Sequence, residues 1–306
     1  MTAPDPTNAT RPESVAGGLL RAARPKQWAK NLLVFAAPAA AGMLDETGPL
    51  ADACIAFASF CLAASGTYLL NDVADREADA RHPTKRLRPI AAGVVPPGVA
   101  TVVGIVAIVG GVALGFVADW HLAVTVAIYV AVTTAYSHWL KHVVILDVVA
   151  VASGFVLRAI GGATATGVPV SDWFFIVTSF GSLFVVTGKR QGEIGDLAEE
   201  EGQAGDIRAT LDEYTESYLA YLRTISSGVM FVAYCVWAFE TAATSSGSVP
   251  WFELSILPFV IAVLRYALLL DRGKGAAPEE LFFADRPLQL AGLAWALVYG
   301  TAVYLA

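Results

Sequence analysis

Long apolar runs alternate with shorter polar segments along this chain, and the runs have the length of membrane-spanning helices. Nine of them predict helices at 28–43, 52–70, 99–117, 121–139, 143–161, 173–187, 219–240, 251–270 and 288–305. A helix needs roughly 20 residues to cross a hydrocarbon core about 30 Å thick. Backbone groups in lipid must bond within their own segment, so the pattern predicts an all-α integral membrane protein with a nine-helix bundle. The first run is short and contains Pro38.

Composition agrees with a membrane protein, because 56% of the 306 residues are apolar and only 15% are charged. A soluble domain carries about a quarter of charged residues. The first thirty residues are polar and basic and do not resemble a cleavable signal peptide. We expect a flexible cytoplasmic tail over 1–24 and a single transmembrane domain over 25–306.

The basic residues predict the orientation of the bundle. With the N-terminus in the cytoplasm, all of the 20 Lys and Arg residues except Arg158 and Arg265, which fall within spans, lie on the inner side. This asymmetry is what the positive-inside rule describes, and an odd number of spans places the C-terminus outside. Two inner loops, about 71–98 and 188–218, are long and charged, so we expect them to cap a cytoplasmic active site.

Three carboxylates follow the second span at helical spacing. No Gly or Pro interrupts the sequence after Asn71, so the helix should continue and place Asp72, Asp75 and Asp79 on one face. Like charges at this spacing repel, and a divalent cation turns the repulsion into binding. Mg²⁺ is usually held by one or two carboxylates and substrate phosphates, which suits a diphosphate substrate. The alternative is a solvated helix end.

Basic residues stand beside these carboxylates and could hold phosphate oxygens. Lys85, Arg86 and Arg88 lie in a stiff loop between two prolines, and they could instead anchor that loop to anionic lipid. Lys189 and Arg190 emerge from the sixth span, where such a pair can also be a topology signal. Lys26 and Lys30, one turn apart beside Trp28, either anchor the first helix or meet a lipid phosphate. Lys141 and Asp147 begin the fifth span near the cytoplasmic cavity.

Other polar residues within spans predict structural roles. Arg158 lies deep in a span, where a charge costs roughly 2.5 to 3.5 kcal/mol on insertion scales, and we expect it to bond helix-breaking backbone near Gly161 and Gly162. The three cysteines all fall in predicted spans, and the four histidines lack partners at metal-ligand spacing.

The aspartate and basic-loop pattern resembles the first signature of the UbiA superfamily of intramembrane prenyltransferases. The matching residues are Asn71-Asp72-x-x-Asp75-x-x-x-Asp79 and His82-Pro83-x-Lys85-Arg86-x-Arg88-Pro89-Ile90-Ala91-x-Gly93, with weaker similarity at Tyr136-Ser137, Leu140-Lys141 and Arg158-Ala159. The resemblance implies a nine-helix bundle around a central cavity that opens to the membrane and is capped by the two inner loops.

This chain departs from most of that superfamily at the sixth-to-seventh loop. Where a second carboxylate-rich signature is expected, it carries Gly188-Lys189-Arg190-x-x-Glu193. Together with Arg24-Pro25-Lys26-Gln27-Trp28-x-Lys30-Asn31, this is similar to the decaprenyl-phosphate phosphoribosyltransferase branch. That branch is implied to join 5-phosphoribosyl diphosphate to a polyprenyl phosphate in the bacterial plasma membrane, making a precursor of cell-wall arabinan. Cations rather than carboxylates suit an acceptor that is a lipid phosphate.

The resemblance, taken with the residues above, assigns roles to the candidate site. Asp72, Asp75 and Asp79 would hold Mg²⁺, and Lys189, Arg190 and Glu193 would complete the catalytic set. Substrate contacts would come from Lys26, Gln27, Lys30, Asn31, Asn71, Lys85, Arg88, Tyr136 and Lys141. The expected partners are the two substrates and membrane lipids, without nucleic acid, and a homo-oligomer is open. Two rival hypotheses stay open: an aromatic prenyltransferase that uses a prenyl diphosphate, and a transporter.

Overall fold

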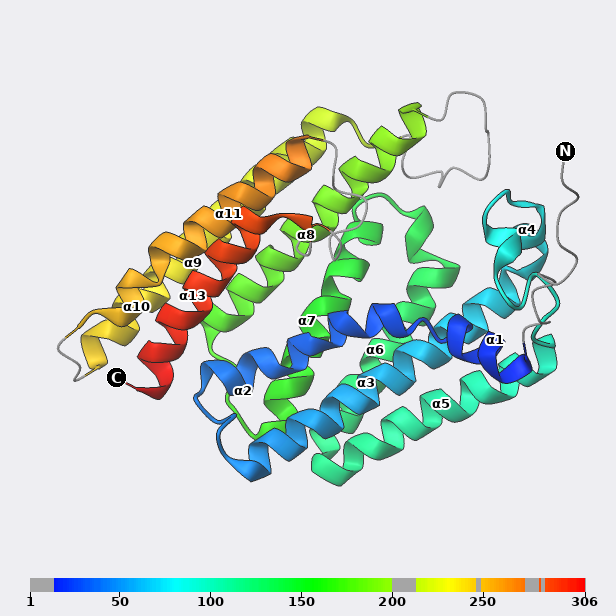
Figure 1. Ribbon diagram of the computed structural model, residues 1–306, viewed down its shortest axis with the longest axis horizontal. Coiled ribbons are helices and arrows are strands. Elements are labelled where there is room, and N and C mark those ends of the chain that lie inside the picture. Colours follow the sequence, from blue (N-terminus) through cyan, green and yellow to red (C-terminus); the bar gives the residue numbers. More distant parts are fainter. Residues whose placement is uncertain (1–13, 200–212, 246–248, 273–280, 282–283, 306) are drawn as a thin grey trace, which may run out of the picture.

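The computed structural model describes residues 14–199, 213–245, 249–272, 281 and 284–305, and every regular element within these ranges is helical (Figure 1). The first group of elements runs through α1 (Val15–Ala22), η1 (Pro25–Phe35), α2 (Ala36–Ala40), α3 (Thr47–Ala74), α4 (Arg76–Arg81) and η2 (Lys85–Leu87). The next runs through α5 (Pro97–Ala118), α6 (Trp120–His138), η3 (Leu140–His142) and α7 (Leu146–Thr166). The last consists of α8 (Asp172–Glu199), α9 (Glu216–Thr244), α10 (Trp251–Leu254), α11 (Ile256–Asp271) and α13 (Arg286–Tyr304).

Six helical stretches in the described part of the chain are long and apolar enough to cross a membrane. They are α3, α5, α6, α7, α9 and the stretch Trp251–Asp271, which comprises α10 and α11. The all-helical membrane fold is therefore confirmed, whereas nine crossings stay a prediction. The C-terminal end of α13 and helix α1 lie at opposite ends of the molecule (Figure 1).

The first predicted span is not a regular α-helix. It forms the 3₁₀ helix η1 and then the five-residue helix α2, which contains Pro38. Helix α1 also occupies part of the segment 1–24, so the prediction of a flexible tail is wrong over Val15–Ala22. Residues 1–13 of that segment, and 200–212 of the second cap loop, lie outside the described residues.

η1 packs directly on the backbone of α7, and a glycine makes this possible. A Cβ atom on Gly162 would lie 1.7 Å from the Val34 carbonyl oxygen. Val34 is itself fully buried, in a core cluster with Phe60, Leu122 and Tyr129. The close approach stabilises a 3₁₀ helix that is unusually long at 11 residues.

Small residues also bring α3 and α5 together. A Cβ atom on Gly66 would lie 2.5 Å from the Gly104 carbonyl oxygen, and one on Gly111 would lie 2.7 Å from the Ser59 carbonyl oxygen. Close backbone approach at small residues is the usual way in which helices associate within lipid, where apolar burial provides little driving force. This packing orients the C-terminal end of α3, close to which the candidate carboxylates lie.

We expect Gly162→Ala to destabilise the protein, because the added methyl group has no space beside the η1 backbone. Overpacking costs typically about 1–3 kcal/mol, so the melting temperature in detergent should fall. Gly228→Ala in α9 is the matched control, since nothing lies within 4 Å of the Cβ position there. Equal melting temperatures for the two variants would contradict the contact between η1 and α7.

Candidate functional site

Two of the three candidate carboxylates, one near the C-terminal end of α3 and one on α4, are buried, and the third is exposed. Asp72 and Asp79 have relative exposures of 2% and 3%, whereas Asp75 is exposed. The predicted continuous helix is wrong at this point, because α3 ends at Ala74, and Asp75 links it to α4 outside helical geometry. The interruption changes the helical register, so Asp75 does not share the buried face of Asp72 and Asp79.

Two arginines from separate segments hold the buried carboxylates. Arg88, which follows η2, donates to Asp72 Oδ1 at 3.2 Å and to Asp79 Oδ2 at 2.7 Å. Arg24, between α1 and η1, donates to the same Asp72 oxygen at 2.6 Å. The two carboxylates are almost fully shielded from water, while about a third of each arginine side chain remains exposed. Removing the cation from such a buried pair is strongly unfavourable.

Sequence reasoning missed Arg24 as a member of this cluster. The residue lies 48 positions before Asp72, and its guanidinium stacks 4.8 Å from the centroid of the Tyr68 ring. Its backbone adopts a φ of 54°, in the left-handed region that a residue with a side chain seldom occupies. This turn lies between α1 and η1. The sequence signal for Arg24 as a site residue was the density of hydrogen-bond donors before the first apolar run.

A second buried network surrounds Arg190 on α8. Its guanidinium donates to Asp147 Oδ2 at 3.1 Å, to Glu193 Oε2 at 2.6 Å and to the Tyr136 hydroxyl at 3.1 Å. Only 3% of the Arg190 side chain is exposed. Lys189 lies beside this network, with its amine 3.8 Å from Glu193 Oε1. The structure therefore joins Tyr136, Lys189, Arg190 and Glu193 in one cluster, as a shared site requires.

Tyr214, at the start of the segment leading into α9, connects the second cap loop to this network. Its hydroxyl donates to Asp147 Oδ1 at 2.5 Å and accepts from the Ile145 backbone N–H at 2.7 Å. Ile145 has a φ of 71°, which is strained for a β-branched residue. Burial and the hydrogen bond to Asp147 raise the pKa of the Tyr214 phenol, so it stays a neutral donor at physiological pH. Tyr214 therefore fixes the start of α7 relative to α9.

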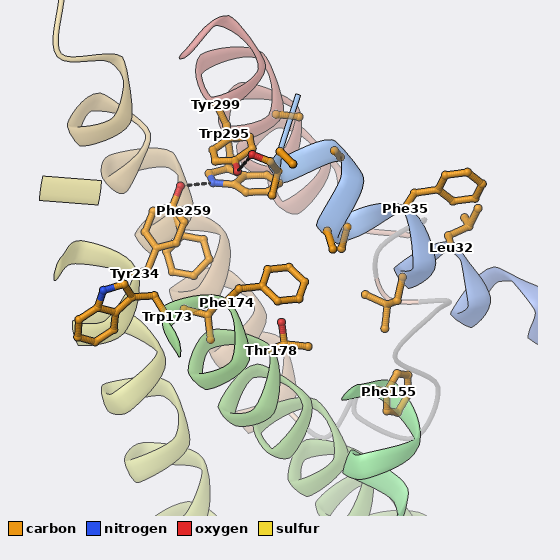
Figure 2. A pocket seen from close by; sticks show the side chains of 18 of the residues that line it. Leu32, Phe35, Phe155, Trp173, Phe174, Thr178, Tyr234, Phe259, Trp295 and Tyr299 are labelled. Atoms are coloured by element: carbon orange, nitrogen blue, oxygen red, sulfur yellow. Dashed lines mark hydrogen bonds between the residues drawn. The ribbon is translucent and has the colours of Figure 1, made fainter. Parts of the chain in front are cut away.

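A large apolar cavity separates η1 and α2 from the C-terminal helices, with a volume of about 1250 Å³. Aromatic rings from α8, α9, α11 and α13 line one side, and Leu32, Phe35 and Phe155 line the other (Figure 2). Between the C-terminal helices, the Trp295 indole N–H donates to the Tyr234 hydroxyl at 2.7 Å. The charged side chains that line the cavity, within the described part of the chain, are Lys30 and Lys189.

The other predicted contact residues occupy different environments. Lys26 is exposed, and Gln27 accepts a hydrogen bond from the Lys30 amine. Asn71 in α3, Lys85 in η2 and Lys141 in η3 are half-buried.

Asn31, another predicted substrate contact, is fully buried and bonds to Arg158. The Arg158 guanidinium donates to Asn31 Oδ1 at 2.6 Å, to the Gly154 carbonyl oxygen at 2.6 Å and to the Tyr129 hydroxyl at 2.9 Å. The prediction that it would bond backbone near Gly161 and Gly162 is wrong, because side chains on a helix lean toward its N-terminus.

Some known proteins are similar to this chain in sequence, and others are similar to it in fold. A model described as the UbiA prenyltransferase family matches residues 32–297. A relative named decaprenyl-phosphate phosphoribosyltransferase, from Corynebacterium glutamicum, is 43% identical over 298 residues. The match covers 96% of this chain and 89% of the relative. A relative of the same name in Mycolicibacterium smegmatis is 44% identical over 304 residues, covering 96% and 94%.

Among solved structures, a UbiA homolog from Archaeoglobus fulgidus bound to GPP and Mg²⁺ superposes with a TM-score of 0.68. The alignment covers 94% of this chain and 100% of that chain at 17% sequence identity. A structure of the same homolog bound to DMAPP and Mg²⁺ gives a TM-score of 0.69, also at 17% identity. At this identity the likeness establishes a shared fold.

We expect Asp147→Ala to destabilise the protein by about 1.5–3 kcal/mol, because it removes a charge-assisted hydrogen bond from the buried Arg190, which keeps Glu193 as its remaining carboxylate. Tyr214→Phe should cost less, about 1–2 kcal/mol, since it removes a hydrogen-bonding hydroxyl only. Tyr218→Phe is the matched control, because Tyr218 stacks on Tyr214 through its ring. Melting temperatures in detergent measure all three, and a Tyr214→Phe variant as stable as Tyr218→Phe would contradict the proposed connection between α9 and α7.

Proposed function

This chain belongs to the UbiA prenyltransferase family, and we propose on that premise that it transfers the 5-phosphoribosyl group of 5-phosphoribosyl diphosphate to a polyprenyl phosphate, releasing diphosphate. Relatives named decaprenyl-phosphate phosphoribosyltransferase, which align over nearly the whole chain, support this substrate pair. The product would be a lipid-linked phosphoribose, a precursor of cell-wall arabinan, made at the cytoplasmic face of a bacterial plasma membrane.

The charge of the cavity is the observation that carries this proposal. Its walls are apolar and aromatic, which suits a polyprenyl chain, and Lys30 and Lys189 are the charged groups on them within the described residues. A lipid phosphate is attracted to two ammonium groups, whereas a carboxylate-rich wall would repel it.

The inner carboxylates fit a divalent cation that arrives with the diphosphate. Asp72 and Asp79 already converge on one cation, the Arg88 guanidinium, and they offer the hard oxygen ligands that Mg²⁺ prefers. Within the described residues no three His, Cys, Asp or Glu side chains form a ligand set. Two carboxylates, with phosphate oxygens as the remaining ligands, agree with the usual way in which Mg²⁺ is held. Asp75, exposed at the break before α4, is the third proposed ligand.

Mg²⁺ bound there would neutralise charge on the departing diphosphate. The chain's own cations would act on the same group. About a third of the Arg24 and Arg88 side chains is exposed, so both can turn from Asp72 to phosphate oxygens while remaining beside the site. Lys85, Lys141 and Asn71 are half-buried at the same inner end and would bind the other phosphate and ribose oxygens.

The acceptor needs to be positioned rather than activated by a base. A phosphate monoester is ionised at neutral pH, so its oxygen can attack the anomeric carbon of the ribose as the bond to diphosphate breaks. Catalysis then consists of alignment and of charge stabilisation on the leaving group. Lys30 and Lys189 would hold the lipid phosphate, while exposed Lys26 and the neighbouring Gln27 would contact the headgroup during entry.

Arg190 is better suited to positioning than to contact with substrate. Its guanidinium is buried and engaged with Asp147, Glu193 and Tyr136. Glu193 is 23% exposed and lies between Arg190 and Lys189, so we propose that it contacts the ribose or the metal. Asn31, fully buried against Arg158, would act only by shaping η1.

The direct test supplies purified protein with 5-phosphoribosyl diphosphate labelled in the ribose, decaprenyl phosphate and Mg²⁺. We expect label to enter the lipid fraction and EDTA to stop the transfer. If no label enters lipid, and a prenyl diphosphate with an aromatic acceptor gives product instead, the rival aromatic prenyltransferase is supported. A product formed in detergent, without any vesicle, also separates the enzyme from a transporter.

Asp75→Asn should lower turnover by about 100-fold or more while leaving a folded protein, because it removes a proposed metal ligand from an exposed position. Glu77→Gln is the matched control, since Glu77 is also exposed and lies two residues away on α4. The rate of label transfer at saturating Mg²⁺ measures both variants. Full activity of Asp75→Asn at ordinary Mg²⁺ concentration would refute its role as a ligand.

A further inference from the structure

A second, smaller pocket lies between α9 and α11, with a volume of about 280 Å³. Its walls come from Arg223, Thr224 and Ser227 on α9, Leu268 and Asp271 on α11, and Phe184 on α8. α9 begins and α11 ends near this pocket, and the two helices run side by side (Figure 1). The volume is several times the ~30 Å³ that one water molecule occupies in the liquid.

The pocket contains a largely buried cation. Arg223 has 11% of its side chain exposed, and among the described residues its Nη1 atom has no hydrogen-bond partner. Nη2 forms an ion pair with Asp271 Oδ1 at 3.6 Å, which is too long for a hydrogen bond. A guanidinium left in this state is costly, and an acceptor anion in the pocket would satisfy it.

The rest of the pocket presents acceptors. The Thr224 hydroxyl donates to the Ala220 carbonyl oxygen at 2.8 Å, and the Ser227 hydroxyl donates to the Thr224 carbonyl oxygen at 3.2 Å. Both hydroxyl oxygens therefore retain lone pairs for a donor. Asp271 adds a carboxylate that is 72% exposed, at the C-terminal end of α11, where the helix dipole favours a cation.

We propose that this pocket binds the headgroup of a phospholipid that carries a phosphate and a primary ammonium group, such as phosphatidylethanolamine. The phosphate would accept from Arg223 in the interior, and the ammonium would donate to Asp271 and the two hydroxyl oxygens at the mouth. An apolar surface for acyl chains continues from the pocket wall along α11. It consists of Leu268, which is 41% exposed, and Leu264, which is 56% exposed and lies one turn before Leu268. Lipid binding in this pocket is independent of the transferase reaction.

The test measures lipid bound per molecule of full-length protein in detergent, by native mass spectrometry. Phosphatidylethanolamine, phosphatidylglycerol and phosphatidylcholine with identical acyl chains are the probes. We expect phosphatidylethanolamine to bind about tenfold more tightly than the other two, the equivalent of one charge-assisted hydrogen bond. Equal binding of all three lipids would overturn the proposal, as would displacement of bound lipid by millimolar inorganic phosphate.

Variants separate the two halves of the headgroup. Arg223→Gln should weaken phosphatidylethanolamine binding about tenfold, and Asp271→Asn should remove the preference over phosphatidylglycerol. Ser227→Leu should block the pocket without any change of charge. Arg272→Gln is the matched control, since Arg272 is exposed beside Asp271. Wild-type binding by the Arg223→Gln variant, or an equal loss with Arg272→Gln, would contradict the assignment, provided that each variant elutes as one monodisperse species.

Discussion

The structure depends on two buried carboxylates that must be neutralised, Asp72 on α3 and Asp79 on α4. Arg88 bridges both and Arg24 holds the first. These contacts join α1, the loop after η2 and α3, although the three segments are far apart in sequence. A site assembled from ion pairs can therefore accept another cation and an anion together, because every group that is released finds a new partner.

Burial divides the arginines into two kinds. Arg158 and Arg190 are almost fully enclosed, and each makes three hydrogen bonds that fix neighbouring helices. Arg24 and Arg88 keep about a third of their side chains exposed, so they can change partners at lower cost. The proposed chemistry requires both kinds: rigid cations that shape the cavity and movable cations that bind phosphate.

The sequence predicted what depends on local pattern. The apolar runs predicted a helical membrane protein, and the basic loop that contains Arg88 was predicted beside the carboxylates, although not its ion pairs with them. The contacts between Arg24 and Asp72, and between Asp147 and Tyr214, are 48 and 67 residues apart, and no local pattern identifies such pairs. The 3₁₀ conformation of η1 depends on the space beside Gly162. The break at Asp75 accompanies the ion pairs that Arg88 forms with Asp72 and Asp79. Both are tertiary effects that override local propensity.

The most direct measurement is a structure of the full chain with 5-phosphoribosyl diphosphate and Mg²⁺ bound. The account predicts oxygens of Asp72, Asp75 and Asp79 on the metal, with Arg88 turned from Asp72 and Asp79 to the diphosphate. A complex in which Arg88 still bridges Asp72 and Asp79, with metal and diphosphate bound elsewhere, would contradict it.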